Sequence, residues 1–128
     1  MKQTFDPTLG LIVLPVEISG PARSGIFHLA LDTGATGTLI NAGVLVSLGY
    51  DPALAQERVQ VTTGSGVEYA ARLPLRRITA LGQTRSEFAI LCHTLPPSAA
   101  VDGLLGLDFL QGTRLEVDFR AGTVNLES

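Results

Sequence analysis

The sequence predicts an all-β domain that contains one or two short helices. Short runs rich in valine, isoleucine, leucine and threonine recur along the chain, and glycine, proline and asparagine separate them. These runs follow one another without long helical patterns between them, which favours an antiparallel arrangement over alternating strands and helices. A chain of 128 residues is long enough for one hydrophobic core but not for two, so residues 1–128 are expected to form a single domain.

The expected strands are short and closely spaced. Their approximate bounds are 11–19, 26–31, 38–40, 58–63, 67–75, 78–81, 87–92, 114–118 and 123–126. Two short helices are also expected. Asn41 is placed to cap the first, which would extend to Leu48 and stop at Gly49. Asp108 is placed to begin and cap the second, over about residues 109–111.

The composition argues against nucleic-acid binding and hints at a protein partner. The net charge is -3, the pI is about 5.2 and tryptophan is absent. The chain therefore lacks the excess of basic residues that binds phosphate groups, and it has few aromatic side chains on which bases could stack. The hydrophobic share of 45% and the mean hydropathy of +0.32 are high for so small a domain. They suggest that some apolar surface is buried against another subunit.

Neither a membrane segment nor a metal site is expected. The apolar run 9–16 is interrupted by Pro15 and is too short for a signal peptide or a membrane span. The single cysteine, Cys92, cannot form an internal disulfide, which fits a cytoplasmic protein, and its apolar neighbours indicate a buried thiol. His28 and His93 have no further ligands at metal spacing, so no metal or other cofactor is expected.

An acidic residue stands in an unusual place at Asp32. It follows the apolar run 29–31 directly, and Gly34 comes two residues later in a tight turn. Acidic side chains are seldom buried unless they are paired, and a glycine lets peptide N–H groups approach a carboxylate closely. Asp32 is therefore the candidate functional residue.

A second unusual segment lies far downstream, at residues 101–110. Within it, two leucines stand between Gly103 and Gly106. Leucines framed by glycines indicate a strand that packs tightly under another backbone.

Together these features resemble the retropepsin-like aspartic proteases, especially the small bacterial members. The resemblance rests on three features in order: Asp32-Thr33-Gly34-Ala35, a glycine-tipped hairpin, and Leu104-Leu105-Gly106 before a short helix. It covers nearly the whole chain. It implies an acid-protease β-barrel that assembles as a homodimer and hydrolyses peptide bonds as an aspartic endopeptidase.

The resemblance also implies a role for each residue of the two motifs. Asp32 would be the catalytic acid, and Thr33 would grip the partner's backbone through its hydroxyl. Gly34 would offer its N–H to the carboxylate, and Ala35 would complete the active-site turn. The segment that braces this turn from behind would consist of Leu104, Leu105 and Gly106.

One aspartate in each chain implies two chains. Hydrolysis of a peptide bond without a metal or a covalent intermediate needs a base that takes a proton from water and an acid that protonates the carbonyl oxygen. Two close carboxylates that share one proton supply both functions. Asp-Thr-Gly occurs once in this chain, so a symmetry-related copy is expected to supply the second carboxylate. The expected partners are a second copy of the chain and a peptide or protein substrate.

Residues 59–70 are expected to form the flap of such an enzyme, a hairpin that closes over substrate and excludes water. The flap residues at its tip would be Thr63, Gly64, Ser65 and Gly66. Glycines on both sides of Ser65 suit any mobile turn, so an ordinary exposed hairpin stays open as an alternative. A phosphate-binding loop is not indicated, because no lysine follows the glycines.

The chain departs from the family pattern at positions that bear on the interface and on pH. Retroviral members have an acidic residue after the alanine and an arginine after the downstream glycine, whereas Thr36 and Leu107 stand here. Ala35 replaces the hydroxyl residue of pepsin-like enzymes, which removes a possible hydrogen bond to the ionised carboxylate. The expected activity optimum is therefore less acidic than that of pepsin.

Two other functions stay open on the residues alone. A non-catalytic or latent dimerisation or peptide-binding module would keep the same fold without the chemistry, although a pure scaffold has no need of a costly carboxylate pair. A monomeric β-barrel that binds a small ligand is the third possibility.

Overall fold

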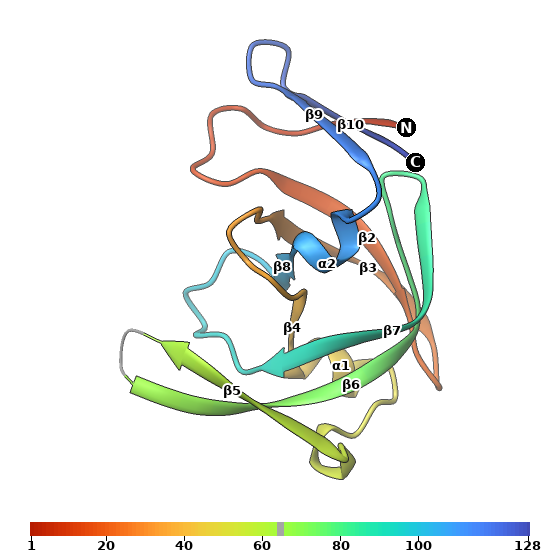
Figure 1. Cartoon of the computed structure of the whole chain (residues 1–128), viewed down its shortest axis with the longest axis vertical. Helices are drawn as coiled ribbons and strands as arrows, with labels where there is room; N and C mark the ends of the chain where they lie inside the picture. Colours follow the sequence, from red (N-terminus) through yellow and green to blue (C-terminus); the bar gives the residue numbers. More distant parts are fainter. Residues whose placement is uncertain (64–65) are drawn as a thin grey trace.

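The computed structural model describes residues 1–63 and 66–128 as a β-rich fold with short helices (Figure 1). The strands are β1 Lys2–Thr4, β2 Val13–Ser19, β3 Ser24–Leu31, β4 Leu39–Asn41, β5 Glu57–Thr63, β6 Gly66–Ala80, β7 Gln83–His93, β8 Gly103–Leu105, β9 Arg114–Asp118 and β10 Thr123–Glu127. The helices are α1 Ala42–Ser47, the 3-10 turn η1 Pro52–Leu54, and α2 Leu107–Leu110. The predicted all-β class with short helices is confirmed.

The larger sheet closes on itself as a barrel. Its strand order is β2-β3-β8-β4-β7-β6-β5, and a further pairing of β2 with β6 completes a ring that leaves β5 outside. Alternating side chains give this barrel an apolar interior. In β2, for example, Leu14, Val16 and Ile18 are buried while Pro15 and Glu17 face solvent, so one face of the strand lines the barrel core.

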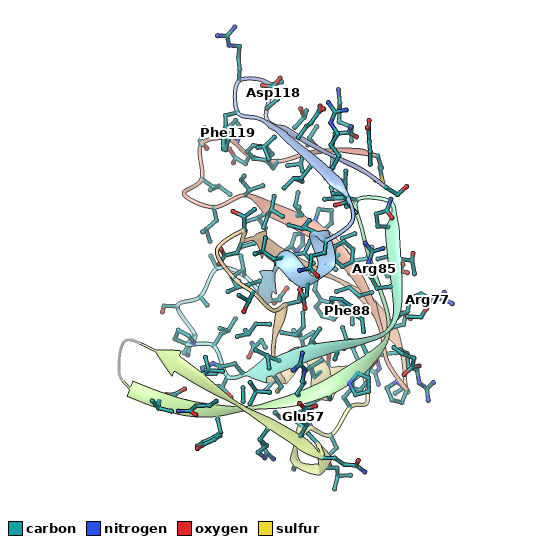
Figure 2. The ribbon with its side chains drawn as sticks, viewed as in Figure 1. Glu57, Arg77, Arg85, Phe88, Asp118 and Phe119 are labelled. Atoms are coloured by element: carbon teal, nitrogen blue, oxygen red, sulfur yellow. The ribbon has the colours of Figure 1, made fainter. Side chains whose placement is uncertain are left out.

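A smaller sheet holds the two ends of the chain together. Its order is β1-β10-β9, and all of its pairings are antiparallel. The N-terminal amino group donates to the Leu126 carbonyl at 2.9 Å, and the two termini lie side by side in Figure 1. At the β9–β10 turn, Phe119 is 69% exposed and packs edge-on against Phe5, with 6.2 Å between ring centroids (Figure 2).

Helix α2 is anchored to the barrel by its aromatic residue. Phe109 is fully buried and meets the ring of Phe88 edge-on at 6.0 Å between centroids. The Arg85 guanidinium lies 5.0 Å from the centroid of the Phe109 ring, and Figure 2 shows Arg85 and Phe88 beside α2. These contacts hold the short helix against β7.

Several expected bounds were wrong, each for a tertiary reason. Strand β1 was not predicted, because a short polar segment becomes a strand here only through its pairing with β10. Strand β6 is continuous through residues 76 and 77, where two strands were expected, because it pairs with β7 on both sides of Arg76. The Asn41 side chain does not cap α1; its Oδ1 accepts from the Leu95 N–H at 3.3 Å instead.

Within residues 1–63 and 66–128, no helix combines the length and the hydropathy that crossing a membrane requires.

Candidate active site

Strand β8 is inserted between the strand that leads into Asp32 and the strand that follows the turn. It runs parallel to β3, with Leu31 opposite Leu105, and antiparallel to β4. The Asp32 N–H donates to the Leu105 carbonyl at 2.9 Å. The backbone of Asp32 is therefore held from behind by the downstream segment, which is about seventy residues away in sequence.

The turn itself presents the Asp32 carboxylate. The Gly34 N–H donates to Asp32 Oδ1 at 2.9 Å, and the Ala35 N–H donates to the Asp32 carbonyl at 3.2 Å. A side-chain carbon on Gly34 would lie 3.2 Å from Asp32 Oδ1, so a bare backbone favours this approach. Thr33 and Gly34 are exposed and Asp32 is partly exposed, which leaves the tip of the turn accessible.

The glycines of the downstream segment are required by close packing. A side-chain carbon on Gly103 would lie 2.1 Å from the Leu39 carbonyl oxygen. One on Gly106 would lie 2.8 Å from the carbonyl carbon of Gly37 and 2.9 Å from the Ala35 oxygen. The expectation that this segment packs under another backbone is confirmed: Gly103 packs under β4, and Gly106 packs under the turn after Asp32.

A buried threonine links the turn to α2. Thr38 is fully buried, and its N–H lies 3.0 Å from each carboxylate oxygen of Asp108 while its hydroxyl donates to Asp108 Oδ1 at 2.7 Å. The Gly106 N–H donates in turn to the Thr38 hydroxyl at 3.1 Å. A carboxylate that accepts bonds from a backbone N–H and a hydroxyl satisfies polar groups that burial would otherwise leave unpaired.

This link corrects the expected role of Asp108. Helix α2 begins at Leu107 with Gly106 at the N-cap position, so Asp108 lies within the first turn rather than before it. Its carboxylate also accepts from the Phe109 N–H at 2.9 Å, but its other partners belong to Thr38. Sequence reasoning missed Thr38, because a threonine at the start of a strand is ordinary until its distant partner is known.

The β5–β6 hairpin extends beyond the strand that pairs with its base. Its ladder extends from Glu57 opposite Arg72 to Thr63 opposite Gly66, whereas β7 accompanies β6 only from Ala71 onward. Two of the predicted flap residues, Gly64 and Ser65, lie outside the described residues. Thr63 and Gly66 form the last described pair of the hairpin.

A cavity lies between the hairpin and the turn. It measures about 250 Å³. Its walls come from the turn, from α2, from the hairpin and from β7; they are Thr36, Gly37, Thr38, Asp108, Val59, Arg72, Ala89, Ile90 and Leu91. The hairpin and the segment that follows the Asp32 turn therefore face a common space.

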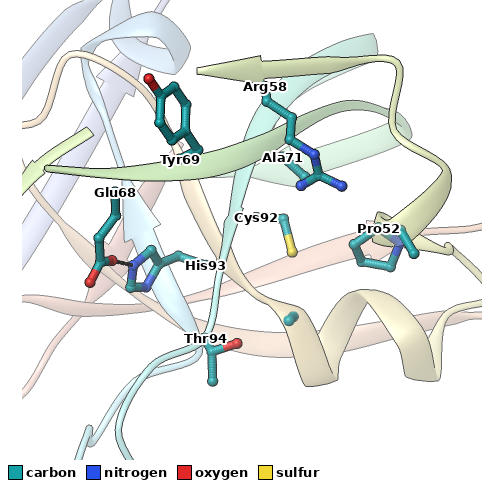
Figure 3. Close-up of a pocket in the computed structure, with 10 residues that line it drawn as sticks. Pro52, Arg58, Glu68, Tyr69, Ala71, Cys92, His93 and Thr94 are labelled. Atoms are coloured by element: carbon teal, nitrogen blue, oxygen red, sulfur yellow. Dashed lines mark hydrogen bonds and ion pairs between the residues drawn. The ribbon is translucent and has the colours of Figure 1, made fainter. Parts of the chain in front are cut away.

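A second cavity lies between the same hairpin, β7 and the α1–η1 segment (Figure 3). It measures about 490 Å³, and His93 Nε2 lies 2.8 Å from Glu68 Oε2 at its wall. Cys92 also lines it, and burial raises the pKa of this thiol although the Arg58 charge opposes the shift. The raised pKa agrees with the expected unreactive thiol.

In the described part of the chain, histidine, cysteine, aspartate and glutamate side chains do not gather in groups of three or more that would hold a metal ion.

Comparison with known proteins gives the family. Residues 15–112 match the sequence model described as gag-polyprotein putative aspartyl protease. The crystal structure of a retropepsin-like aspartic protease from Rickettsia conorii superposes with a TM-score of 0.71 at 15% identity, covering 99% of this chain and 91% of that one. The retroviral protease-like domain of Ddi1 from Leishmania major superposes with a TM-score of 0.61 at 18% identity, covering 94% and 97%. No curated protein sequence matches.

At these identities the structural likeness establishes the fold, and the sequence match extends over most of the chain. The chain belongs to the gag-polyprotein putative aspartyl protease family and has the retropepsin-like fold.

Proposed function

We propose that this chain is an aspartic endopeptidase that acts as a homodimer, with Asp32 of both subunits at one catalytic centre. The observation that carries the proposal is the Asp32 turn: a carboxylate at a strand end, held by the Gly34 N–H at 2.9 Å and accessible at the tip of its turn. The family supports it, because its members are described as aspartyl proteases.

The reaction would use one proton shared by the two carboxylates. At close separation two like charges do not both ionise, so one group is protonated and the other is not. The ionised carboxylate takes a proton from water as that water attacks the peptide carbonyl, and the protonated one gives its proton to the carbonyl oxygen. Collapse of the tetrahedral intermediate, with proton transfer to the nitrogen, releases the two peptide products. No metal and no covalent intermediate is needed.

The neighbouring residues would position these two groups. The exposed hydroxyl of Thr33 would bind the partner's backbone, and Gly34 and Ala35 would keep the turn narrow enough for the Gly34 N–H to reach the carboxylate. The bracing set would be Leu104, Leu105 and Gly106, which support the turn through the Asp32 N–H bond and the close approach of Gly106. Residues 59–70 would act as the flap.

The substrate would be a peptide segment in extended conformation, paired through its backbone with the flap hairpin. Side chains would enter spaces such as the cavity of about 250 Å³ between the hairpin and the turn. The whole of residues 1–128 would act as one catalytic domain in the cytoplasm, without a cofactor.

Cleavage of an unstructured protein tests the proposal. We expect fragments that disappear when a peptidomimetic with a hydroxyl at the scissile position is added, and that are absent with Asp32→Asn. The matched control is Asp118→Asn, an exposed aspartate at the end of β9, which should cleave like the unchanged protein. Dimers that bind the peptidomimetic without cutting any substrate would instead favour the peptide-binding or latent module on the same fold.

A further inference from the structure

The two faces of the β5–β6 hairpin border different cavities. Side chains alternate along a strand, and directly opposite residues of an antiparallel pair share a face. Val59 and Arg72 therefore lie on one face of the hairpin, and Arg58 and Tyr69 lie on the other. The first two line the cavity of about 250 Å³ that residues 36–38 also border. The other two line the cavity of about 490 Å³ (Figure 3). Of these two arginines, Arg72 is the one that faces the space between the hairpin and residues 36–38.

The smaller cavity has apolar walls and two charged groups. The apolar side chains are Val59, Ala89, Ile90 and Leu91.

Of the described residues that line this cavity, Arg72 and Asp108 carry charge. The Asp108 carboxylate accepts hydrogen bonds from the N–H and the hydroxyl of Thr38 and from the Phe109 N–H. These donors already stabilise the ionised carboxylate from within the protein. The charge in the cavity that is free to select a ligand is therefore the positive charge of Arg72.

The Arg72 guanidinium is held loosely inside the chain. Its ion-pair partner is Glu57, with 3.8 Å between Nη1 and Oε1, which is longer than a hydrogen bond. The two side chains are 44% and 64% exposed, and an exposed pair at this distance contributes little to stability. A guanidinium also presents its N–H donors in a planar fork that fits a carboxylate. Arg72 can therefore bind a carboxylate that enters the cavity.

We propose that Arg72 is a specificity-determining residue, and that the preferred substrate is a peptide whose acidic side chain enters the cavity of about 250 Å³. This rests on the proposed function, which lays an extended peptide against the hairpin. The methylene groups of a glutamate contact the apolar walls, and its carboxylate pairs with the guanidinium. A glutamine in the same place gains no ion pair, and a lysine meets a like charge.

Peptide binding to the full chain with Asp32→Asn tests the proposal without any measurement of activity. The probes are labelled, unstructured peptides in which each position in turn is glutamate or its neutral isostere glutamine, and fluorescence anisotropy measures their dissociation constants. At one position, glutamate should bind at least about fivefold more tightly than glutamine. A second substitution, Arg72→Gln, should remove this preference, and Arg72→Glu should reverse it. Arg72→Lys, which keeps the charge but not the planar fork, should keep part of it.

The matched control is Arg58→Gln, which removes the same charge from the opposite face of the same hairpin. The preference for glutamate should be unchanged in this variant. Glu57→Gln removes the internal partner of Arg72 and should increase the preference. Circular dichroism should show that all variants keep the fold.

Salt gives the second measurement. From roughly 50 to 500 mM NaCl, the preference for glutamate should shrink while the binding of the glutamine peptide changes little, because salt screens a partly exposed ion pair.

Four results would overturn the proposal: no binding of any peptide, equal binding of glutamate and glutamine at every position, a preference that persists with Arg72→Gln, or one that Arg58→Gln also removes. The proposed function fails separately. A protein with Asp32 intact that binds glutamate peptides through Arg72 but never cleaves them would keep the specificity and lose the peptidase. Cleavage that depends on Asp32 but ignores the charge of the peptide would keep the peptidase and lose the specificity.

Discussion

Thr38 and Asp108 form a hydrogen-bonded unit across 70 residues of sequence, with the Thr38 hydroxyl 2.7 Å from Asp108 Oδ1. Because Thr38 also accepts from the Gly106 N–H, the unit joins the turn after Asp32, the end of β8 and the start of α2. The position of the Asp32 carboxylate therefore depends on a polar contact that lies behind it and does not touch it.

Replacement of Thr38 by valine should measure this contact. Valine keeps the shape of the side chain but leaves Asp108 Oδ1 and the Gly106 N–H without their hydroxyl partner, at a cost of about 1–3 kcal/mol in the free energy of unfolding. Urea denaturation measures the loss. Thr36→Val, at an exposed position in the same turn, is the matched control and should change stability by less than about 0.5 kcal/mol. Equal losses at the two positions would show that the Thr38–Asp108 unit has no special role.

Gly106→Ala should be severely destabilising. Its new carbon would lie 2.8 Å from the Gly37 carbonyl carbon, and backbone atoms on this side cannot move without shifting the Asp32 turn. We expect a loss of about 3 kcal/mol or more, or failure to fold. Gly43→Ala in α1 is the control: nothing lies within 4 Å of the added carbon, so it should stabilise the chain by about 0.5–1 kcal/mol through helix propensity. Thermal unfolding of both variants decides between these outcomes, and a Gly106→Ala protein as stable as the unchanged one would contradict the packing.

The pH dependence of cleavage should respond to position 35. A hydroxyl there can donate to an ionised carboxylate and favour its charged form, so Ala35→Ser should move the acidic limb of the pH–rate profile to lower pH. The unchanged protein should have an optimum less acidic than pepsin's. A profile that peaks below about pH 3 in the unchanged protein would contradict this expectation, as would a serine variant whose acidic limb shifts upward.

Tyr50 should govern part of the alkaline stability. Its hydroxyl donates to the Ser19 carbonyl at 2.6 Å and accepts from the Arg76 N–H at 2.8 Å, and burial raises its pKa above the ordinary value of 10.0. Because the folded-state pKa is raised, the folded protein holds this proton more tightly. Stability from this group is complete below the unfolded pKa and is lost as pH rises through about 10 and beyond.

Because the chain has only two tyrosines, the pKa of Tyr50 and its effect on stability can be measured separately from those of Tyr69. Tyr69→Phe removes the exposed tyrosine, so absorbance titration then follows Tyr50 alone and should show its pKa raised above 10.0. Tyr50→Phe should cost about 1–3 kcal/mol at neutral pH and should reduce the loss of stability on the alkaline side. A Tyr50 that titrates below the ordinary tyrosine value would disprove the burial argument.

The terminal sheet and β6 show where sequence reasoning reached its limit. Strand β9 was predicted with the bounds that the structure has, because Arg114–Asp118 alternates apolar and charged residues in the period of a half-buried strand. Lys2–Thr4 has no such pattern and is a strand because β10 offers it an edge. The insertion of β8 between β3 and β4 has no local signature either, since it pairs segments that are distant along the chain.

The sequence alone was enough to identify Asp32, its glycine turn and the leucines between Gly103 and Gly106. Tight turns and close packing of backbones require particular residue types, glycine above all, and these are visible in the sequence. Tertiary structure alone decided that Asp108 binds Thr38 rather than capping a helix. The physical reason is distance along the chain: a hydrogen bond or an apolar contact between remote segments depends on how the strands are ordered, and composition carries no record of that order.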